Sequence, residues 1–392
     1  MILVADAGLW SIGSRDTATP PPLSAILEVS GAVLTWTIDD PAGGAAPQIT
    51  FTDLDRADWL WRVVGESGCV AITSATEQAP ESRRIELPGI DLLAGALDAP
   101  HRLAVGHWLR RWWPASQRDG IASLDHSLLD IEVAVLTSTT EEFFIDDTLD
   151  SDVTELLAPH ARALLDRVAL PDPRIRSLIR AATRLADEVG VDDGDWAELS
   201  VALHDSVVSG DWIARRQDDF ALAAGSPAGT VDPADIARGV ASISWSAVPP
   251  RVFDAGEGTV QWSLQAARSG AGTGAGRAEP LTASVHAAVI GPDRATGIPV
   301  LLRSGPITGV GTMDADGTAA LPLFDAHARP LTETTAWDHD WAPTTVLVGA
   351  VLPDAAEPPE VRERVRRWVR ARLAQPPADA FLAEILASES DY

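Results

Sequence analysis

The spacing of the apolar residues changes twice along this chain of 392 residues, and that change limits the folds that the chain can adopt. Apolar positions alternate with period two in a half-buried strand, whereas they recur every three or four residues in a helix packed on one side. The strand period dominates residues 1–90, the helix period dominates 91–237, and the strand period returns over 238–352. We therefore expect an α+β multidomain protein.

Residues 1–90 predict a small antiparallel β unit. The run 32–38 is typical of it, because β-branched residues alternate with other apolar residues and a turn signal follows at 39–41. We expect the sheet to continue through the runs 59–64 and 69–72. Cys69, the only cysteine of the chain, lies in the second run, so we expect a buried and unreactive thiol.

Residues 91–237 predict a bundle of four to six helices. Leu124, Leu128, Ile131 and Val135 are separated by steps of four, three and four, which places them on one face of a helix. Three further helices are expected at 152–168, 174–189 and 195–208.

Residues 238–352 predict a β-sandwich, because several short strand-like runs follow one another with turn signals between them. The runs lie at 240–248, 259–266, 281–290, 298–303 and 344–352. The sequence Asp314-Ala315-Asp316-Gly317 predicts a hairpin turn. Calcium binding by the two aspartates is the alternative, but the later ligands of an EF-hand loop do not follow them.

Residues 353–392 predict an acidic, proline-rich hinge and a helical tail. One helix is expected at 361–373, with an apolar face and an arginine-rich face, and a second at about 378–387. Such an arginine-rich helix could suggest a membrane or a nucleic acid as partner. We instead expect the helix to dock on an acidic surface, either its own or that of a partner.

The charge of the chain supports this choice. The formal net charge is −27 at pH 7, so the chain repels nucleic acids and anionic membranes at long range. All 30 basic residues are arginine, which agrees with a GC-rich bacterial genome or with selection against lysine. The absence of lysine excludes phosphate-binding P-loops, kinases, pyridoxal phosphate enzymes and Ser-x-x-Lys nucleophiles.

The expected location is the cytoplasm. Residues 1–6 lack the basic start of a signal peptide, and no run approaches the roughly 18 uncharged apolar residues of a membrane-spanning helix.

The sequence Trp337-Asp338-His339-Asp340-Trp341 is the strongest candidate for chemistry. A carboxylate beside an imidazole can orient it for general base catalysis. In an extended chain, however, Asp338 and Asp340 point away from the side of His339, so we favour a turn anchored by the tryptophans. The motifs Gly-x-Ser-x-Gly and His-Glu-x-x-His do not occur. We therefore assign no catalytic, cofactor-binding or metal-binding residue.

Two tryptophan- and arginine-rich clusters are predicted to contact other proteins, because these residue types are enriched at interface hot spots. The alternative for the first cluster is that its tryptophans fill the junction between the β unit and the helices. The predicted interaction residues are Trp108, Arg110, Arg111, Trp112 and Trp113, with Arg362, Arg366, Arg367, Trp368 and Arg370 in the tail.

From these patterns we expect a non-catalytic adaptor or structural component of a multi-protein bacterial assembly, with a defence or conflict system as one setting. Its partners would be other proteins of the same system or further copies of the chain. Two alternatives remain open. One is a hydrolase that uses Asp338, His339 and Asp340, and the other is a self-assembling scaffold in which the arginine-rich helix docks on the next copy.

Overall fold

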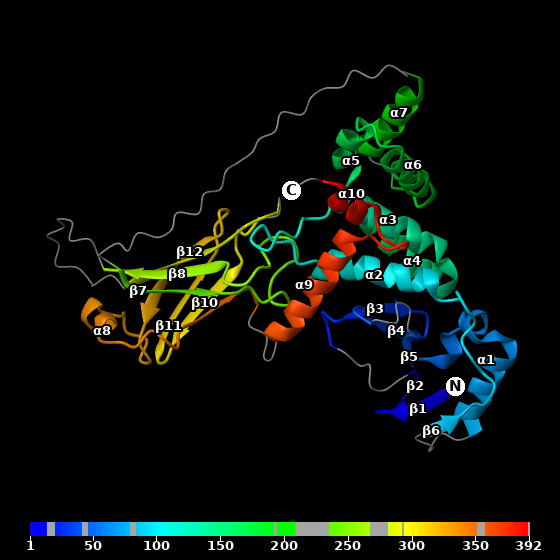
Figure 1. Ribbon diagram of the computed structural model, residues 1–392, viewed down its shortest axis with the longest axis horizontal. Coiled ribbons are helices and arrows are strands. Elements are labelled where there is room, and N and C mark those ends of the chain that lie inside the picture. The colour runs from blue at the N-terminus through cyan, green and yellow to red at the C-terminus, as the bar shows by residue number, and fades with distance from the viewer. Residues whose placement is uncertain are drawn as a thin grey trace. The chain divides into compact units, whose positions relative to one another are not determined.

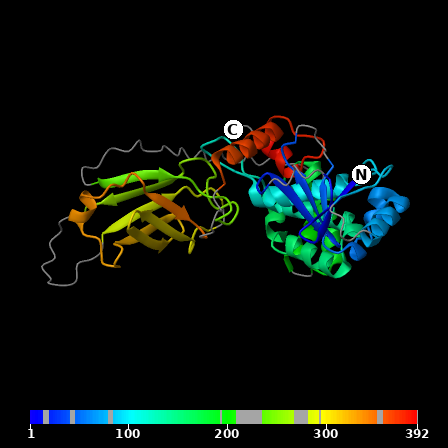
Figure 2. The same cartoon turned by 90° about the horizontal axis from the view of Figure 1, so that it is seen from below.

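The structure is a computed structural model that describes residues 1–13, 20–40, 46–78, 84–191, 194–208, 235–266, 281–291, 294–350 and 357–390. It has the α+β multidomain layout that the sequence predicts. Two compact units are present, and each combines segments that lie far apart in the sequence (Figures 1 and 2). Unit 1 consists of 1–113, 124–210 and 359–392, and unit 2 of 114–123 and 211–358.

The described strands of unit 1 form an antiparallel sheet with the order β3-β4-β5-β2-β1-β6. Apolar residues at alternate positions build its buried face; in β4, Ala32, Leu34 and Trp36 are buried and the residues between them are partly exposed. The strands are β1 (Ile2–Asp6), β2 (Leu9–Ile12), β3 (Ser24–Val29), β4 (Ala32–Thr37), β5 (Gln48–Phe51) and β6 (Arg84–Glu86).

The prediction of strands at 59–64 and 69–72 is wrong, because residues 60–64 and 69–72 belong to helix α1 (Leu60–Gln78), which is kinked at Gly65. The aromatic and β-branched residues suggested strands, but the buried residues Leu60, Val63, Val64 and Ile72 recur at helical spacing. Tertiary packing therefore overrides the local preference for strand. Cys69 lies on this helix and is only partly buried, and this burial, with a smaller effect of Asp58, raises the pKa of its thiol.

Among the remaining helices of unit 1, α2 packs against β3, and α3 packs in turn against α2, α4 and α6. The predicted helix at 152–168 is two helices, since Pro159 has no N–H with which to continue the first one. The helices are α2 (Asp98–Trp112), α3 (His126–Thr139), α4 (Asp146–Leu157), α5 (Ala161–Val168), α6 (Pro173–Glu188), α7 (Gly194–Val208), α9 (Pro359–Ala374) and α10 (Leu382–Glu389).

The helical tail packs inside unit 1. In α2, Gly106 leaves room for it, because a Cβ atom there would lie 2.7 Å from Phe381 Cζ at the start of α10. The predicted second tail helix begins at Leu382, later than expected, because Phe381 before it is extended and donates its N–H to Glu384. The predicted hinge residues 353–356 lie outside the described residues.

The described strands of unit 2 form one antiparallel sheet with the order β13-β10-β11-β12-β9-β8-β7. They are β7 (Asp235–Ala241), β8 (Val260–Gln265), β9 (Thr282–Ala287), β10 (Pro299–Ser304), β11 (Ile307–Thr312), β12 (Thr318–Phe324) and β13 (Thr345–Val348). The short helix α8 (Glu333–Trp337) precedes β13.

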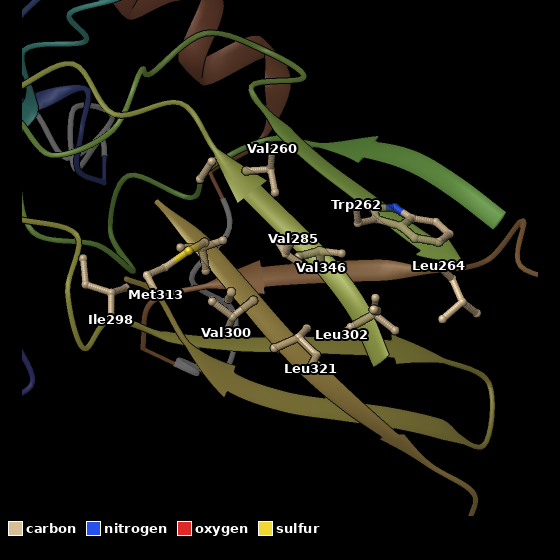
Figure 3. Close-up of a cluster of buried hydrophobic side chains, with 14 of the residues drawn as sticks. Val260, Trp262, Leu264, Val285, Ile298, Val300, Leu302, Met313, Leu321 and Val346 are labelled. Atoms are coloured by element: carbon tan, nitrogen blue, oxygen red, sulfur yellow. The ribbon is translucent and has the colours of Figure 1, made fainter. Parts of the chain in front are cut away.

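The sheet of unit 2 curls into a near-barrel around one core. One part of the sheet consists of β7, β8, β9 and β12, and the other of β10, β11 and β13. Strand β12 joins the two parts, because it pairs with β9 over most of its length but with β11 only at two positions. Side chains from both parts, Trp262 and Val285 on one and Leu302 and Val346 on the other, meet in one apolar cluster (Figure 3). Burial of this cluster stabilises unit 2.

Two turns in unit 2 are held by carboxylates. The predicted hairpin turn is confirmed: Asp314 Oδ1 accepts hydrogen bonds from the N–H of Asp316 at 3.0 Å and of Thr318 at 2.9 Å. The predicted strand at 240–248 ends early, with β7 stopping at Ala241. Glu357 accepts hydrogen bonds from the N–H groups of Trp245 and Ser246, which folds that segment into turns.

None of the helices in the described segments combines the length and the apolar character needed to cross a membrane.

Candidate functional site

Unit 1 contains a cavity of about 440 Å³. It lies between the end of β4, the helices α2 and α9, and the loop between α9 and α10. The side chains that give it its chemical character are Trp36, Asp40, Asp98, His101, Trp368 and Asp379.

Aromatic side chains form one part of the cavity lining. The centroids of the Trp36 and His101 rings are 5.3 Å apart, and the Trp368 ring packs edge-on against Trp108 at 4.9 Å. Trp36 is 5% exposed because it follows the buried alternation of β4. Packing against their neighbours therefore fixes both indoles that line the cavity.

A buried ion pair lies beside these rings. Arg372 Nε lies 2.6 Å from Glu384 Oε1, Arg372 Nη2 lies 2.8 Å from Oε2, and Glu384 has no exposed surface. Glu384 Oε2 also accepts a hydrogen bond from the N–H of Phe381 at 2.9 Å. Burial alone would lower the pKa of Arg372, but hydrogen bonds and charge from Glu384 raise it overall. The positive charge of Arg372 is thus neutralised inside the protein.

A second charged network holds the loop that borders the cavity. Arg102 Nε donates to the carbonyl of Asp379 at 3.1 Å, and its Nη2 lies 2.5 Å from Glu132 Oε1. Glu132 Oε2 accepts from the N–H of Leu382 at 2.7 Å. These bonds hold the end of the loop that leads into α10.

Carboxylates predominate among the charged side chains that line the cavity. Asp40, Asp98 and Asp379 contribute carboxylates from three separate elements. Burial lowers the pKa of His101; Arg372 acts in the same direction, whereas Asp379 and Asp98 oppose it, so the neutral imidazole is favoured at pH 7. Arg372 pairs with Glu384, lies 3.8 Å from a carboxylate oxygen of Asp379, and places its guanidinium over the Trp368 ring at 4.9 Å from the ring centroid.

The predicted cluster at 108–113 is partly internal. Trp108 is buried, and its Nε1 donates to the carbonyl of Pro22 at 2.6 Å. Arg110 Nε lies 2.7 Å from Asp130 Oδ1, and the Arg111 guanidinium lies 4.4 Å from the centroid of the Trp112 ring. Trp112 and Trp113 are half-buried.

The arginine-rich helix α9 is also part of unit 1. Arg362 and Arg366 are buried, whereas Arg367 and Arg370 are exposed. Arg364, on the arginine-rich face but outside the predicted interaction residues, forms two hydrogen bonds of 2.8 and 2.9 Å with Asp39 of the N-terminal sheet region. The helix therefore docks on an acidic group of its own unit, one of the two surfaces expected from the sequence.

The structure brings two predicted residues together, since Trp108 and Trp368 pack against each other. Sequence patterns missed Trp36, His101, Arg372 and Glu384. Glu384 accepts a hydrogen bond from the N–H of Phe381, the N-cap residue of α10, but Phe381 has no side-chain acceptor that would complete a capping box, so the sequence carried no capping signal there.

The residues Asp338, His339 and Asp340 do not assemble into a catalytic set. His339 Nε2 lies 2.9 Å from Ser304 Oγ, but Ser304 is fully buried, so a substrate cannot reach this hydroxyl. Asp340 Oδ1 accepts instead from the N–H of Ala342. Trp341 anchors the turn, because its Nε1 donates to the carbonyl of Ala336 at 2.8 Å, while Trp337 is exposed.

A further charged cluster joins three helical segments of unit 1. Asp130 accepts hydrogen bonds from Arg110 and pairs with His160 Nε2 at 2.9 Å. Burial alone would raise the pKa of Asp130, but these partners lower it overall. Burial and the nearby Arg110 lower the pKa of His107 to about 4. Within the described ranges, no group of three His, Cys, Asp or Glu side chains is arranged to hold a metal ion.

Unit 2 has a groove of about 590 Å³ over the strands β7, β8 and β9. The described lining includes Arg238, Gln261, Ser284 and His286 and contains no carboxylate. Strand β7 lies at the edge of the sheet, and among the described residues it pairs only with β8. Its Val240 side chain is 70% exposed at this groove.

No protein-family model matches this chain, and no curated protein or solved structure is significantly similar to it.

Proposed function

We propose that the protein is a non-catalytic adaptor or structural component of a multi-protein bacterial assembly, and that unit 2 takes up an extended segment of a partner protein. The observation that carries this proposal is the edge strand β7, with Val240 exposed beside a groove. An edge strand offers backbone N–H and C=O groups with which a further strand can pair. Such strand addition needs no catalytic residues.

The chemistry of the groove suggests what the segment carries. Arg238 and His286 line the groove, and its described lining has no carboxylate, although the whole chain has a net charge of −27. An acidic side chain of the partner can therefore pair with Arg238 without meeting a like charge in the groove. We propose an extended acidic segment as the ligand, with an apolar side chain against Val240.

The hydrolase alternative has less support. A nucleophile must reach the substrate, and the hydroxyl bound by His339 belongs to the buried Ser304.

The test compares two exposed valines of the same sheet. Val240→Asp places a carboxylate at the proposed docking edge, whereas Val310→Asp places one on the inner strand β11, where Val310 is 65% exposed. Tagged versions of both chains are purified from the native host, and the captured proteins are identified by mass spectrometry. We expect a defined partner with the wild type and with Val310→Asp, and its loss with Val240→Asp.

The captured partner then supplies a direct measurement. A synthetic peptide from its acidic segment should bind the purified chain, and Arg238→Glu should weaken that binding at least tenfold. A partner that remains bound to Val240→Asp and Arg238→Glu would show that the edge of β7 is not the docking site. If light scattering shows the chain pairing with itself through Val240, the adaptor proposal gives way to the scaffold alternative.

A further inference from the structure

The curled sheet of unit 2 has two edge strands, β7 and β13, and its described strands leave the barrel open between them. We propose that the extended segment of the partner lies in this opening, antiparallel to both edge strands, and closes the barrel; this inference rests on the proposed strand addition at β7. All neighbours among the described strands are antiparallel, so the seven-stranded order makes β7 and β13 parallel to each other. One further strand, antiparallel to both, continues the alternation around the whole barrel.

The two edge strands border the same opening. Near their starts, residues 236–240 of β7 line a pocket of about 380 Å³ together with Trp341 and Thr344, which precede β13. Beyond their ends, the N–H of Ala350 donates to the carbonyl of Ala247 at 2.7 Å. The opening is therefore bounded by β7 on one side and by β13 on the other.

The apolar core of unit 2 is incompletely covered at this opening. Among the described residues, five hydrophobic residues that pack against the core are only partly buried, and four of these belong to the two borders. They are Ile236, Ala237 and Ala241 on β7 and Trp341 before β13. The Trp341 ring lies 6.2 Å from that of Trp262 in the core, measured between centroids. Apolar side chains of an added strand would cover this surface, which favours binding.

The backbone of β13 presents its inward residues to the opening. The N–H of Gly349 donates to the carbonyl of Pro299 on β10 at 2.8 Å, and hydrogen-bonded pairs alternate along an antiparallel ladder. Val346 and Val348 therefore direct their N–H and C=O groups away from β10 and into the opening. The side chains of both valines are buried in the core.

The backbone of β7 presents its outward residues instead. The N–H of Ala288 donates to the carbonyl of Thr259 at 3.1 Å, and the same alternation, carried across β8, directs the bonds of Gly239 toward β8. Arg238 and Val240, on either side of this glycine, therefore direct their N–H and C=O groups into the opening. The side chains of both residues are exposed.

This difference between the two edges is what a single inserted strand requires. Successive residues of a strand direct their side chains to opposite faces and their N–H groups to opposite edges. A strand in the opening can therefore pair its outward residues with β7 and its inward residues with β13. The outward residues are the acidic and apolar side chains proposed to meet Arg238 and Val240, and the inward residues are apolar.

Isothermal titration calorimetry of the full chain with a synthetic peptide of two Val-Glu-Val-Leu repeats tests the proposal. The valines of the peptide supply the inward face, and its glutamates and leucines supply the outward face. N-methylation of the valines removes the donors to β13, whereas N-methylation of the other residues removes the donors to β7. We expect one unmodified peptide to bind per chain, and each methylated peptide to bind at least tenfold more weakly.

Hydrogen exchange of the backbone amides locates the peptide. The amides of Val240 and Val346 should exchange at least tenfold more slowly in the complex, and that of Val310 on the inner strand β11 should be unchanged. A peptide of the same composition with its glutamates adjacent should bind at least tenfold more weakly, because its inward and outward residues no longer alternate.

Three results would overturn the closure of the barrel. Unchanged affinity after methylation of the valines would mean that the segment adds to β7 alone, and the proposed docking function would stand. Slow exchange of Val240 and Val346 in the free chain would show that the opening is already filled. Absence of binding at millimolar concentrations of the unmodified peptide is the third. The capture experiment with Val240→Asp decides the docking proposal separately.

Discussion

Arg372 and Glu384 form a bidentate ion pair with N–O distances of 2.6 and 2.8 Å, and the carboxylate of this pair is completely closed to solvent. The pair links α9, which lines the cavity, to α10, which packs against α3. Removing one partner of a buried pair leaves the other charge without compensation, which costs more than the pair itself contributes.

The first prediction follows from this pair. We expect Glu384→Gln to lower the free energy of unfolding of unit 1 by about 3–5 kcal/mol, because Arg372 stays buried, loses its bidentate partner and keeps only the more distant carboxylate of Asp379 at 3.8 Å. The matched control is Glu389→Gln on the same helix, whose partner Arg174 is exposed to water. Urea denaturation followed by circular dichroism should show a large shift for the first variant and none for the second. Equal shifts would contradict the role of burial.

The second prediction concerns Gly106 in α2. A Cβ atom at this position would lie 2.7 Å from both Phe381 Cζ and Val133 Cγ2, which are closely packed. We expect Gly106→Ala to destabilise unit 1 by about 1–3 kcal/mol through overpacking. Gly194→Ala at the start of α7 is the control, since no atom lies within 4 Å of its added Cβ. Thermal unfolding should separate the two, and a neutral Gly106→Ala would mean that the tail helix packs differently.

The third prediction is an acid-dependent loss of stability. The pKa of His107 is about 4 in the folded chain, against about 6.5 in an unfolded one. Between these values the unfolded chain binds a proton that the folded chain does not, so the free energy of unfolding falls as the pH drops from about 6.5 to 4. The expected contribution is at most about 3 kcal/mol, and His101 acts in the same direction.

Denaturation at a series of pH values between 7 and 4 measures this slope. His107→Gln cannot gain the proton, so it should flatten the dependence even where it lowers the stability at pH 7. A slope that is unchanged in His107→Gln would assign the acid sensitivity to other groups.

The fourth prediction separates structure from catalysis at His339. The imidazole is bonded to the buried Ser304 and packs on Trp341, so we expect His339→Ala to destabilise unit 2 by about 1–2 kcal/mol. We expect the wild type to have no turnover of ester or peptide substrates that this variant could abolish. Hydrolysis by the wild type that disappears in a folded His339→Ala protein would instead support the hydrolase alternative.

The sequence predicted the elements whose periodicity is strong. The helix that contains Leu128 and Ile131 and the turn at Asp314 are present as expected, because a helical face and an Asp-Gly turn are local properties. Residues 59–72 were misassigned, since their aromatic and β-branched residues favour strands while their buried positions follow helical spacing.

The cavity could not be predicted in the same way. Trp36, His101 and Arg372 come from β4, α2 and α9, and a single sequence holds no signal that these segments meet. The Arg364–Asp39 ion pair joins residues 325 positions apart, which illustrates the difficulty. The arginine-rich face of α9 did indicate an acidic docking surface, but not which carboxylates would form it.

The division of unit 1 among three stretches of the chain has a consequence for its synthesis. Helices α9 and α10 leave the ribosome only after residues 211–358, which belong to unit 2, have been made. Until then the growing chain lacks Phe381 to fill the space at Gly106 and Arg364 to pair with Asp39. Unit 2 can thus complete its core during translation, whereas the first part of the chain to be made must wait for α9 and α10 to emerge before it matures.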